Sequence, residues 1–127
     1  MPFRALDVVR DWDGTAGKPK WRMLVCVNPY DLWFYRINTR DTFRPCIALS
    51  KLPHHDRLLD HDSFIEVNLL EFDDFGMTDA TVVGRVHHTM IDAILAAVDR
   101  SIHLSEADKT AIRDALNEER PAYDAPD

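Results

Sequence analysis

The segment from Asp62 to Leu104 constrains the fold most, because two strand patterns are followed directly by an amphipathic helix pattern. In DSFIEVN, the apolar residues fit a strand that is buried on one side. A second short apolar run, VVGRV, contains Gly-Arg near its end. Beyond it, the apolar residues fall on one helical stripe, namely Met90, Ile91, Ile94, Leu95 and Val98. The segment therefore predicts two strands and then a helix over about His87 to Arg100.

Four more strand patterns precede this segment, and a second helix pattern follows it. The strand patterns cover Ala5–Val9, Lys20–Asn28, Leu32–Asn38 and Pro45–Lys51. The NPYD turn favours an antiparallel hairpin between the second and the third. The second helix is expected to begin after Ser105, which can cap it, with Asp108 in the capping-box position.

The spacing of these patterns indicates how the strands pair. The links are too short for parallel crossovers, which need about a dozen residues or more. The stretch Asp11–Lys20 contains two Gly and one Pro, which is typical of a loop. The sequence predicts a strand-dominated α+β fold, a small antiparallel barrel of five to six strands with two C-terminal helices. We expect one domain over residues 1–119 and a flexible C-terminal tail over residues 120–127.

Composition favours a cytoplasmic protein with reduced thiols. No apolar run approaches the roughly 20 residues of a membrane helix, so no membrane association is expected. The N-terminal residues lack the apolar core of a secretory signal. Cys26 and Cys46 both lie in apolar, strand-like runs, which favours two buried structural thiols over a disulfide or a metal pair.

The charged residues are unevenly distributed along the chain. The net charge of −7 argues against non-specific binding to nucleic acid, which depends on neutralising phosphates. Acidic residues crowd residues 56–79 and 106–127, whereas the first 44 residues are rich in Lys and Arg. This asymmetry fits one face that accepts an anion, and it equally fits an ordinary solvated surface of mixed charge.

The order of the elements resembles that of the MazF/PemK-like toxin family over Leu6 to Ser105. The segments that carry the resemblance are LDVV, KPKWRMLVCV, LWFYRINT, DSFIEVN, VVGRV and MIDAILAAVDRSIHLS. The resemblance implies an SH3-like barrel of the CcdB/PemK type, a homodimer, and metal-independent cleavage of single-stranded RNA. Trp21 and Met23 stand where the family has Gly and Pro, and residues 45–61 align poorly.

The same resemblance implies two catalytic residues, Arg22 and Thr39. An arginine beside the scissile phosphate can stabilise its charge with two hydrogen bonds and supply a proton, and a hydroxyl can hold a phosphate oxygen. Simpler roles exist for both residues. Arg22 can be an edge-strand arginine whose stem covers Trp21 or Trp33. Thr39 can be an ordinary strand-end residue or turn cap.

Aromatic and basic residues near the N-terminal loops form a candidate RNA-binding surface. Trp12 and Phe43 are expected to stack on unpaired bases. Lys18, Lys20 and Arg40 are expected to contact phosphates. Packing in the barrel core is the competing account for most aromatic residues of this region.

The histidine-rich loop from His54 to His61 carries no clear metal pattern. Adjacent histidines on an extended chain point in opposite directions, so His54 and His55 do not easily ligate one ion. We expect a solvated polar loop, and neither a metal nor another cofactor. His61 is a candidate general base, and Asp62 with Ser63 fits a structural strand start.

Three functions follow as hypotheses. The first is a metal-independent endoribonuclease acting on single-stranded RNA, the toxin of a type II toxin–antitoxin pair with an antitoxin protein as partner. The alternative is a non-catalytic binding module on the same barrel for a protein or a nucleic acid, which Trp21, Met23 and the acidic charge favour. The third is inhibition of a topoisomerase, as in the related CcdB-type barrels.

Overall fold

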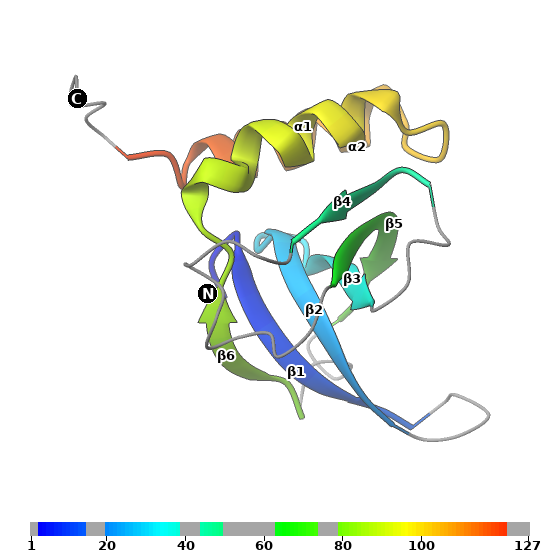
Figure 1. Ribbon diagram of the computed structural model, residues 1–127, viewed down its shortest axis with the longest axis vertical. Helices are drawn as coiled ribbons and strands as arrows, with labels where there is room; N and C mark the ends of the chain where they lie inside the picture. Colours follow the sequence, from blue (N-terminus) through cyan, green and yellow to red (C-terminus); the bar gives the residue numbers. More distant parts are fainter. Residues whose placement is uncertain (1–2, 15–19, 39–43, 50–62, 74–78, 122–127) are drawn as a thin grey trace.

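The computed structural model describes residues 3–14, 20–38, 44–49, 63–73 and 79–121, which form an antiparallel sheet with two C-terminal helices (Figure 1). The strands are β1 (Asp7–Asp13), β2 (Lys20–Asn28), β3 (Trp33–Asn38), β4 (Cys46–Ala48), β5 (Phe64–Glu71) and β6 (Thr81–Arg85). A 3-10 turn, η3 (His88–Met90), leads into α1 (Ile91–Arg100), and α2 (Glu106–Asn117) follows. The predicted strand-dominated α+β fold is confirmed.

All strands belong to one six-stranded sheet with the order β4-β5-β3-β2-β1-β6. Every pairing is antiparallel. The register shifts between Val8 and Val9, between Cys26 and Asn28, and between Tyr35 and Arg36. Such irregularities increase the local twist, and the sheet curves into a barrel-like shape beneath the helices (Figure 1).

The turn between β2 and β3 is organised by the side chain of Asn28. Its carbonyl accepts a hydrogen bond from the backbone N–H of Tyr30 at 3.0 Å, and its amide donates to Asp31 at 2.9 Å. Leu32 then adopts a positive φ of 58°, which directs the chain into β3. The predicted hairpin between these two strands is confirmed.

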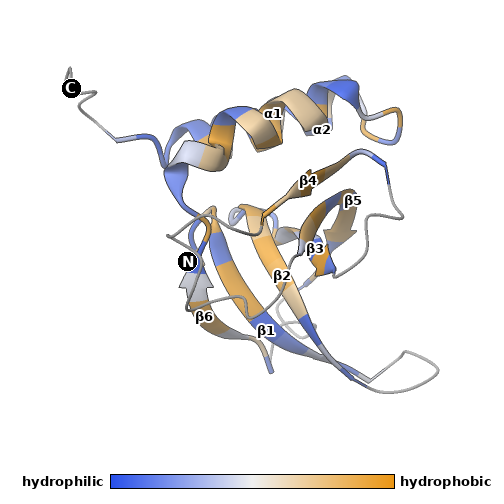
Figure 2. Cartoon of the chain, viewed as in Figure 1, coloured by the Kyte–Doolittle hydropathy of each residue, from blue (hydrophilic) through white to orange (hydrophobic). Residues whose placement is uncertain are grey.

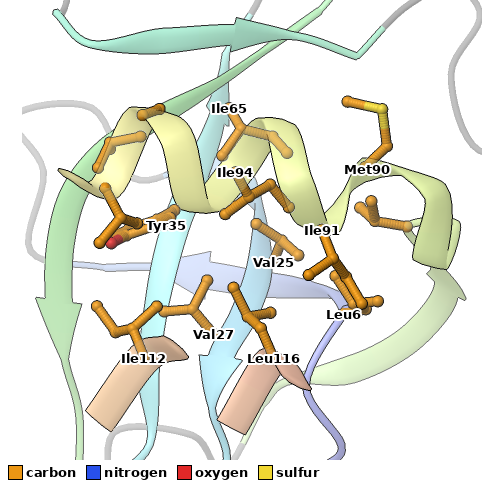
Figure 3. Close-up of a cluster of buried hydrophobic side chains, with 14 of the residues drawn as sticks. Leu6, Val25, Val27, Tyr35, Ile65, Met90, Ile91, Ile94, Ile112 and Leu116 are labelled. Carbon is orange, nitrogen blue, oxygen red and sulfur yellow. The ribbon is translucent and has the colours of Figure 1, made fainter. Parts of the chain in front are cut away.

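The main core lies between the helices and one face of the sheet (Figure 3). In β2, Val25 and Val27 point into this core, whereas the intervening Cys26 points to the other face, as the alternation of a strand requires. α1 lies against β4, and α2 against β2. The helices contribute Ile91, Ile94, Ala97, Val98, Ile112 and Leu116.

A smaller core lies on the opposite face of the sheet. Phe34 is its centre and makes edge-to-face contacts with Phe3 and Phe72, each with ring centres 5.7 Å apart. Cys26 is fully buried here, and burial raises its pKa to about 12. The prediction of a buried thiol is confirmed for Cys26. It is wrong for Cys46, which is only partly buried because β4 lies at an edge of the sheet.

The second helix begins at its predicted capping residue, and the first begins with a different kind of turn than predicted. The Ser105 hydroxyl accepts a hydrogen bond from the Asp108 backbone N–H at 3.1 Å, so the predicted start of the second helix is confirmed. The predicted helix over His87–Arg100 begins as a 3-10 turn and becomes α-helical at Ile91. None of the described helices has the length and apolar character needed to cross a membrane.

The first strand and the loop after it differ from the prediction. Leu6 has a φ of 75°, so the chain turns there and β1 begins at Asp7 rather than Ala5. The strand then continues to Asp13, which makes the start of the expected Asp11–Lys20 loop part of the sheet. Cross-strand partners in β2 explain this extension, because they satisfy its backbone groups.

Ion pairs connect the end of α2 to the sheet and to α1. Arg85 of β6 donates to Asp7 of β1 at 2.7 Å and to Glu119 at 2.9 Å. Arg120 pairs with Asp92 of α1 at 2.7 Å. The predicted tail of residues 120–127 therefore begins with an anchored arginine, and residues 122–127 lie outside the described part of the chain.

Candidate nucleic-acid interface

Arg22 in β2 forms an ion pair with Asp11 on the neighbouring strand β1. The two residues are register partners in the sheet. The Nε and Nη2 groups of Arg22 both donate to Oδ2 of Asp11, at 3.0 and 2.8 Å. The Arg22 side chain is 15% exposed and the Asp11 side chain 1%. The guanidinium thus compensates a buried carboxylate, which is costly to bury without a cation.

The other neighbours of Arg22 fix its position further. Its Nη1 lies 3.6 Å from a carboxylate oxygen of Asp13, and its guanidinium carbon lies 4.9 Å from the ring centre of Phe72. Within the described residues, Oδ1 of Asp11 has no hydrogen-bond partner. Asp11 therefore depends on Arg22, so the arginine has a structural role. The predicted structural alternative was an edge-strand arginine, but β2 lies inside the sheet and the partner is a buried carboxylate.

A groove of about 450 Å³ lies beside this ion pair. It brings together two residues predicted for the site, the catalytic candidate Arg22 and the stacking candidate Trp12. The described residues that line it also include two acids, Asp13 and Glu71, and the apolar Phe72. Two carboxylates beside one arginine weaken the attraction of this groove for a phosphate.

Trp12 and Trp21 form an exposed aromatic pair across β1 and β2. Their ring centres are 5.3 Å apart at an interplanar angle of 65°. The two residues are 40% and 48% exposed. The guanidinium carbon of Arg10 lies 4.1 Å from the ring centre of Trp21. This Trp12–Trp21–Arg10 cluster presents aromatic faces and a cation together on the surface.

Sequence reasoning missed two members of this cluster, Trp21 and Arg10. Trp21 belongs to the aromatic residues near the N-terminal loops but is not among the residues predicted to bind RNA, and Arg10 is not among them either. Their contribution follows from the register, in which Trp12 is the partner of Trp21. The signal in the sequence was that both tryptophans lie at similar distances from the centre of the Gly-containing loop.

The remaining predicted site residues are only partly described. Lys20 is the first residue of β2, exposed, and the register partner of Asp13. Asn38, the last residue of β3, donates to Glu66 at 2.8 Å. Outside the described residues lie Lys18, Thr39, Arg40, Phe43 and the loop from His54 to His61. In the part of the chain that is described, no group of three or more His, Cys, Asp or Glu is placed to hold a metal ion.

The first 44 residues and the rest of the chain differ in net charge. Residues 1–44 carry eight Lys and Arg against five Asp, whereas the remaining residues carry seven Lys and Arg against seventeen Asp and Glu. β1 and β2 lie in the first part and together carry three Lys and Arg against three Asp. Both strands are apolar beneath the helices and become hydrophilic toward Asp13 and Lys20 (Figure 2). An anionic partner therefore meets less repulsion at this end of the sheet than at the helices.

Comparisons of this chain with protein-family models, with curated proteins and with solved structures found no match.

Proposed function

We propose that this protein is a binding module that takes up single-stranded RNA on the Trp12–Trp21–Arg10 cluster. The observation that carries the proposal is the exposed tryptophan pair with an arginine stacked on it. Proteins that bind unpaired nucleic acid combine aromatic faces for stacking with cations along the backbone. An exposed aromatic pair reaches the faces of unstacked bases, which a duplex does not offer.

Each member of the cluster has a distinct task in this proposal. Trp12 and Trp21 stack on neighbouring bases, and each stacked base contributes on the order of 1–3 kcal/mol to binding. Arg10 holds its guanidinium over Trp21, which orders the side chain and leaves N–H groups for a phosphate. Lys20 at the start of β2 supplies a second cation.

Arg22 has a structural task in this proposal, because its Nε and Nη2 groups are already engaged by Asp11. The ion pair of Arg22 with Asp11 offsets the cost of burying the Asp11 carboxylate. Binding without cleavage follows from this engagement, since no other described arginine lies in the groove beside Trp12.

A titration of labelled single-stranded RNA in EDTA tests the proposal. We expect Trp21→Ala to weaken binding at least fivefold, because one stacking face is lost. Tyr30→Ala is the matched control, since Tyr30 is a 56% exposed aromatic residue at the β2–β3 turn, away from the cluster. Equal affinities for wild type and Trp21→Ala, or no binding by the wild type, contradict the proposal.

A second candidate function is metal-independent cleavage of that RNA, favoured by the groove that holds Arg22 beside Trp12. In this chemistry the ribose 2′-hydroxyl attacks the adjacent phosphate, and Arg22 stabilises the developing charge. The protein would then fit the toxin of a toxin–antitoxin pair, with an antitoxin and a second copy of itself as partners.

The reaction products distinguish the two candidates. RNA recovered intact after incubation in EDTA supports the binding module. Cleavage that disappears in Arg22→Lys supports the nuclease, because lysine keeps a cation beside Asp11 but cannot make the planar two-point contact. A circular dichroism spectrum identical to that of the wild type is required of the variant.

A further inference from the structure

A second cavity lies between the start of β4 and the end of α1, with a volume of about 400 Å³. The described residues that line it are Arg44, Pro45, Cys46, Arg100 and Ile102. β4 forms one edge of the sheet, whereas β1 and β2 lie toward the other edge. The cavity is therefore separate from the Trp12–Trp21–Arg10 cluster, and it shares no lining residue with the groove beside Arg22.

The charged residues that line this cavity in the described part of the chain are two arginines. Its described lining holds two arginines and no carboxylate. Arg44 donates through Nη1 to the sulfur of Cys46 at 2.9 Å. Among the described residues, Arg100 has no carboxylate partner, in contrast to Arg113, which pairs with Asp99 at 2.6 Å. In a chain with a net charge of −7, the guanidinium of Arg100 on this cavity points to an anionic occupant.

The other residues that line the cavity indicate which kind of anion it can bind. Ile102 is 90% exposed and, with Pro45, gives the cavity an apolar wall. Cys46 is partly exposed and has a guanidinium on its sulfur. Reactive thiols occur in partly exposed, electropositive surroundings, because the thiolate is the nucleophile. The cavity thus combines arginine side chains with a partly exposed sulfur.

We propose that this cavity binds a small anionic thiol compound and that Cys46 forms a mixed disulfide with it. The Cys46 thiolate attacks one sulfur of the compound's disulfide form, and a new sulfur–sulfur bond forms. The original disulfide bond breaks, and its other half leaves as a thiolate that takes up a proton from water. Cys46 is oxidised and the leaving half is reduced, so that the disulfide reagent supplies the oxidant. Arg100 holds a carboxylate of the bound half, and Arg44 lies on the Cys46 sulfur.

Cys26 is an internal control for this reaction. It lies fully buried in the smaller core, and burial raises its pKa to about 12. A thiol of that kind is protonated at neutral pH and out of reach of solvent, so it remains unreactive while the chain is folded.

The experiment treats the full chain with oxidised glutathione, which is anionic, and separately with the uncharged disulfide of mercaptoethanol. Peptide mapping by mass spectrometry locates the adduct and gives the rate at each cysteine. We expect a glutathione adduct on Cys46 and none on Cys26. We expect Arg100→Gln to slow the glutathione reaction about fivefold, which is the effect of one charge pair in water. The uncharged reagent should react at an unchanged rate.

Two further variants make the result specific. Arg100→Lys keeps the cation and should restore most of the rate. Arg113→Gln removes an equal charge from the surface of α2 without touching the cavity, and should leave the rate unchanged. Equal effects of Arg100→Gln on both reagents, equal labelling of both cysteines, or no adduct at all would overturn the proposal.

Discussion

The guanidinium of Arg22 shows how the surroundings of a residue decide its role. Its residue type and position suit phosphate chemistry, yet two of its donors are bound to one oxygen of Asp11. Asp11 is 1% exposed, and its second oxygen lacks a hydrogen-bond partner among the described residues. Removing the arginine would leave this carboxylate buried and uncompensated. Arg10 directly precedes Asp11 in β1. Its guanidinium lies on the surface above the ring of Trp21.

Arg22→Ala should lower the free energy of unfolding by about 3–5 kcal/mol, the usual cost of stranding a buried charge. The double variant Asp11→Asn with Arg22→Gln should lose less, because no charge is left unpaired. Arg10→Ala is the control, and we expect a loss below about 1 kcal/mol for this exposed residue. Urea denaturation measures all three. A loss in Arg22→Ala as small as that in Arg10→Ala would refute the structural role of the ion pair.

Stability should fall in alkaline solution because of two buried groups. Burial raises the pKa of Cys26 from 9.0 to about 12 and also raises the pKa of Tyr35 above 10.0. The neutral forms are therefore favoured in the folded chain. The contribution of Cys26 is complete below pH 9 and is lost as the pH rises through about 12, whereas that of Tyr35 begins to fall only above pH 10.

The pH dependence can be measured as the free energy of unfolding in urea between pH 8 and pH 11. For Cys26 we expect a decrease of up to about 1.4 kcal/mol per pH unit above pH 9. Cys26→Ala should flatten the curve just above pH 9, and Tyr35→Phe should flatten it above pH 10. A wild-type curve that stays level to pH 11 contradicts the assignment.

At the level of elements, a strand or helix could be predicted where a single local sequence signal determines its start or its pairing. Ser105 before an amphipathic stretch predicted the start of α2, and the Asn28 turn predicted the β2–β3 hairpin. The start of β1 could not be predicted, because the positive φ of Leu6 carries no marker such as glycine. The Arg22–Asp11 pair could not be predicted either. It depends on the register between β1 and β2, which no local pattern specifies.

The cap of α2 offers a direct test at this scale. Ser105→Ala removes the acceptor for the Asp108 backbone N–H and should cost about 1 kcal/mol of stability. Ser105→Asp keeps an acceptor at the same position and should preserve stability. Thermal unfolding of the three proteins measures the difference. Equal losses in both variants would show that the hydroxyl is not acting as the cap.

At the scale of the whole molecule, the two ends of β1 and β2 have different tasks. The helices seal one face over the main core, which gives the sheet a rigid support (Figure 3). The β1–β2 end extends away from the helices and carries the exposed tryptophans (Figure 1). The acidic residues belong mainly to the later part of the chain, whereas β1 and β2 carry equal numbers of cationic and acidic residues. This separation places a candidate RNA surface on a stable scaffold.

The indole N–H signals of the three tryptophans test this account most directly. They can be followed by NMR while single-stranded RNA is added in EDTA. Trp12 and Trp21 are exposed, whereas Trp33 is partly buried and packs against the main core. The account predicts saturable shifts of the Trp12 and Trp21 signals, an unmoved Trp33 signal and intact RNA at the end of the titration. Signals of Trp12 and Trp21 that stay in place while RNA is bound elsewhere, or that do not respond at all, would contradict it.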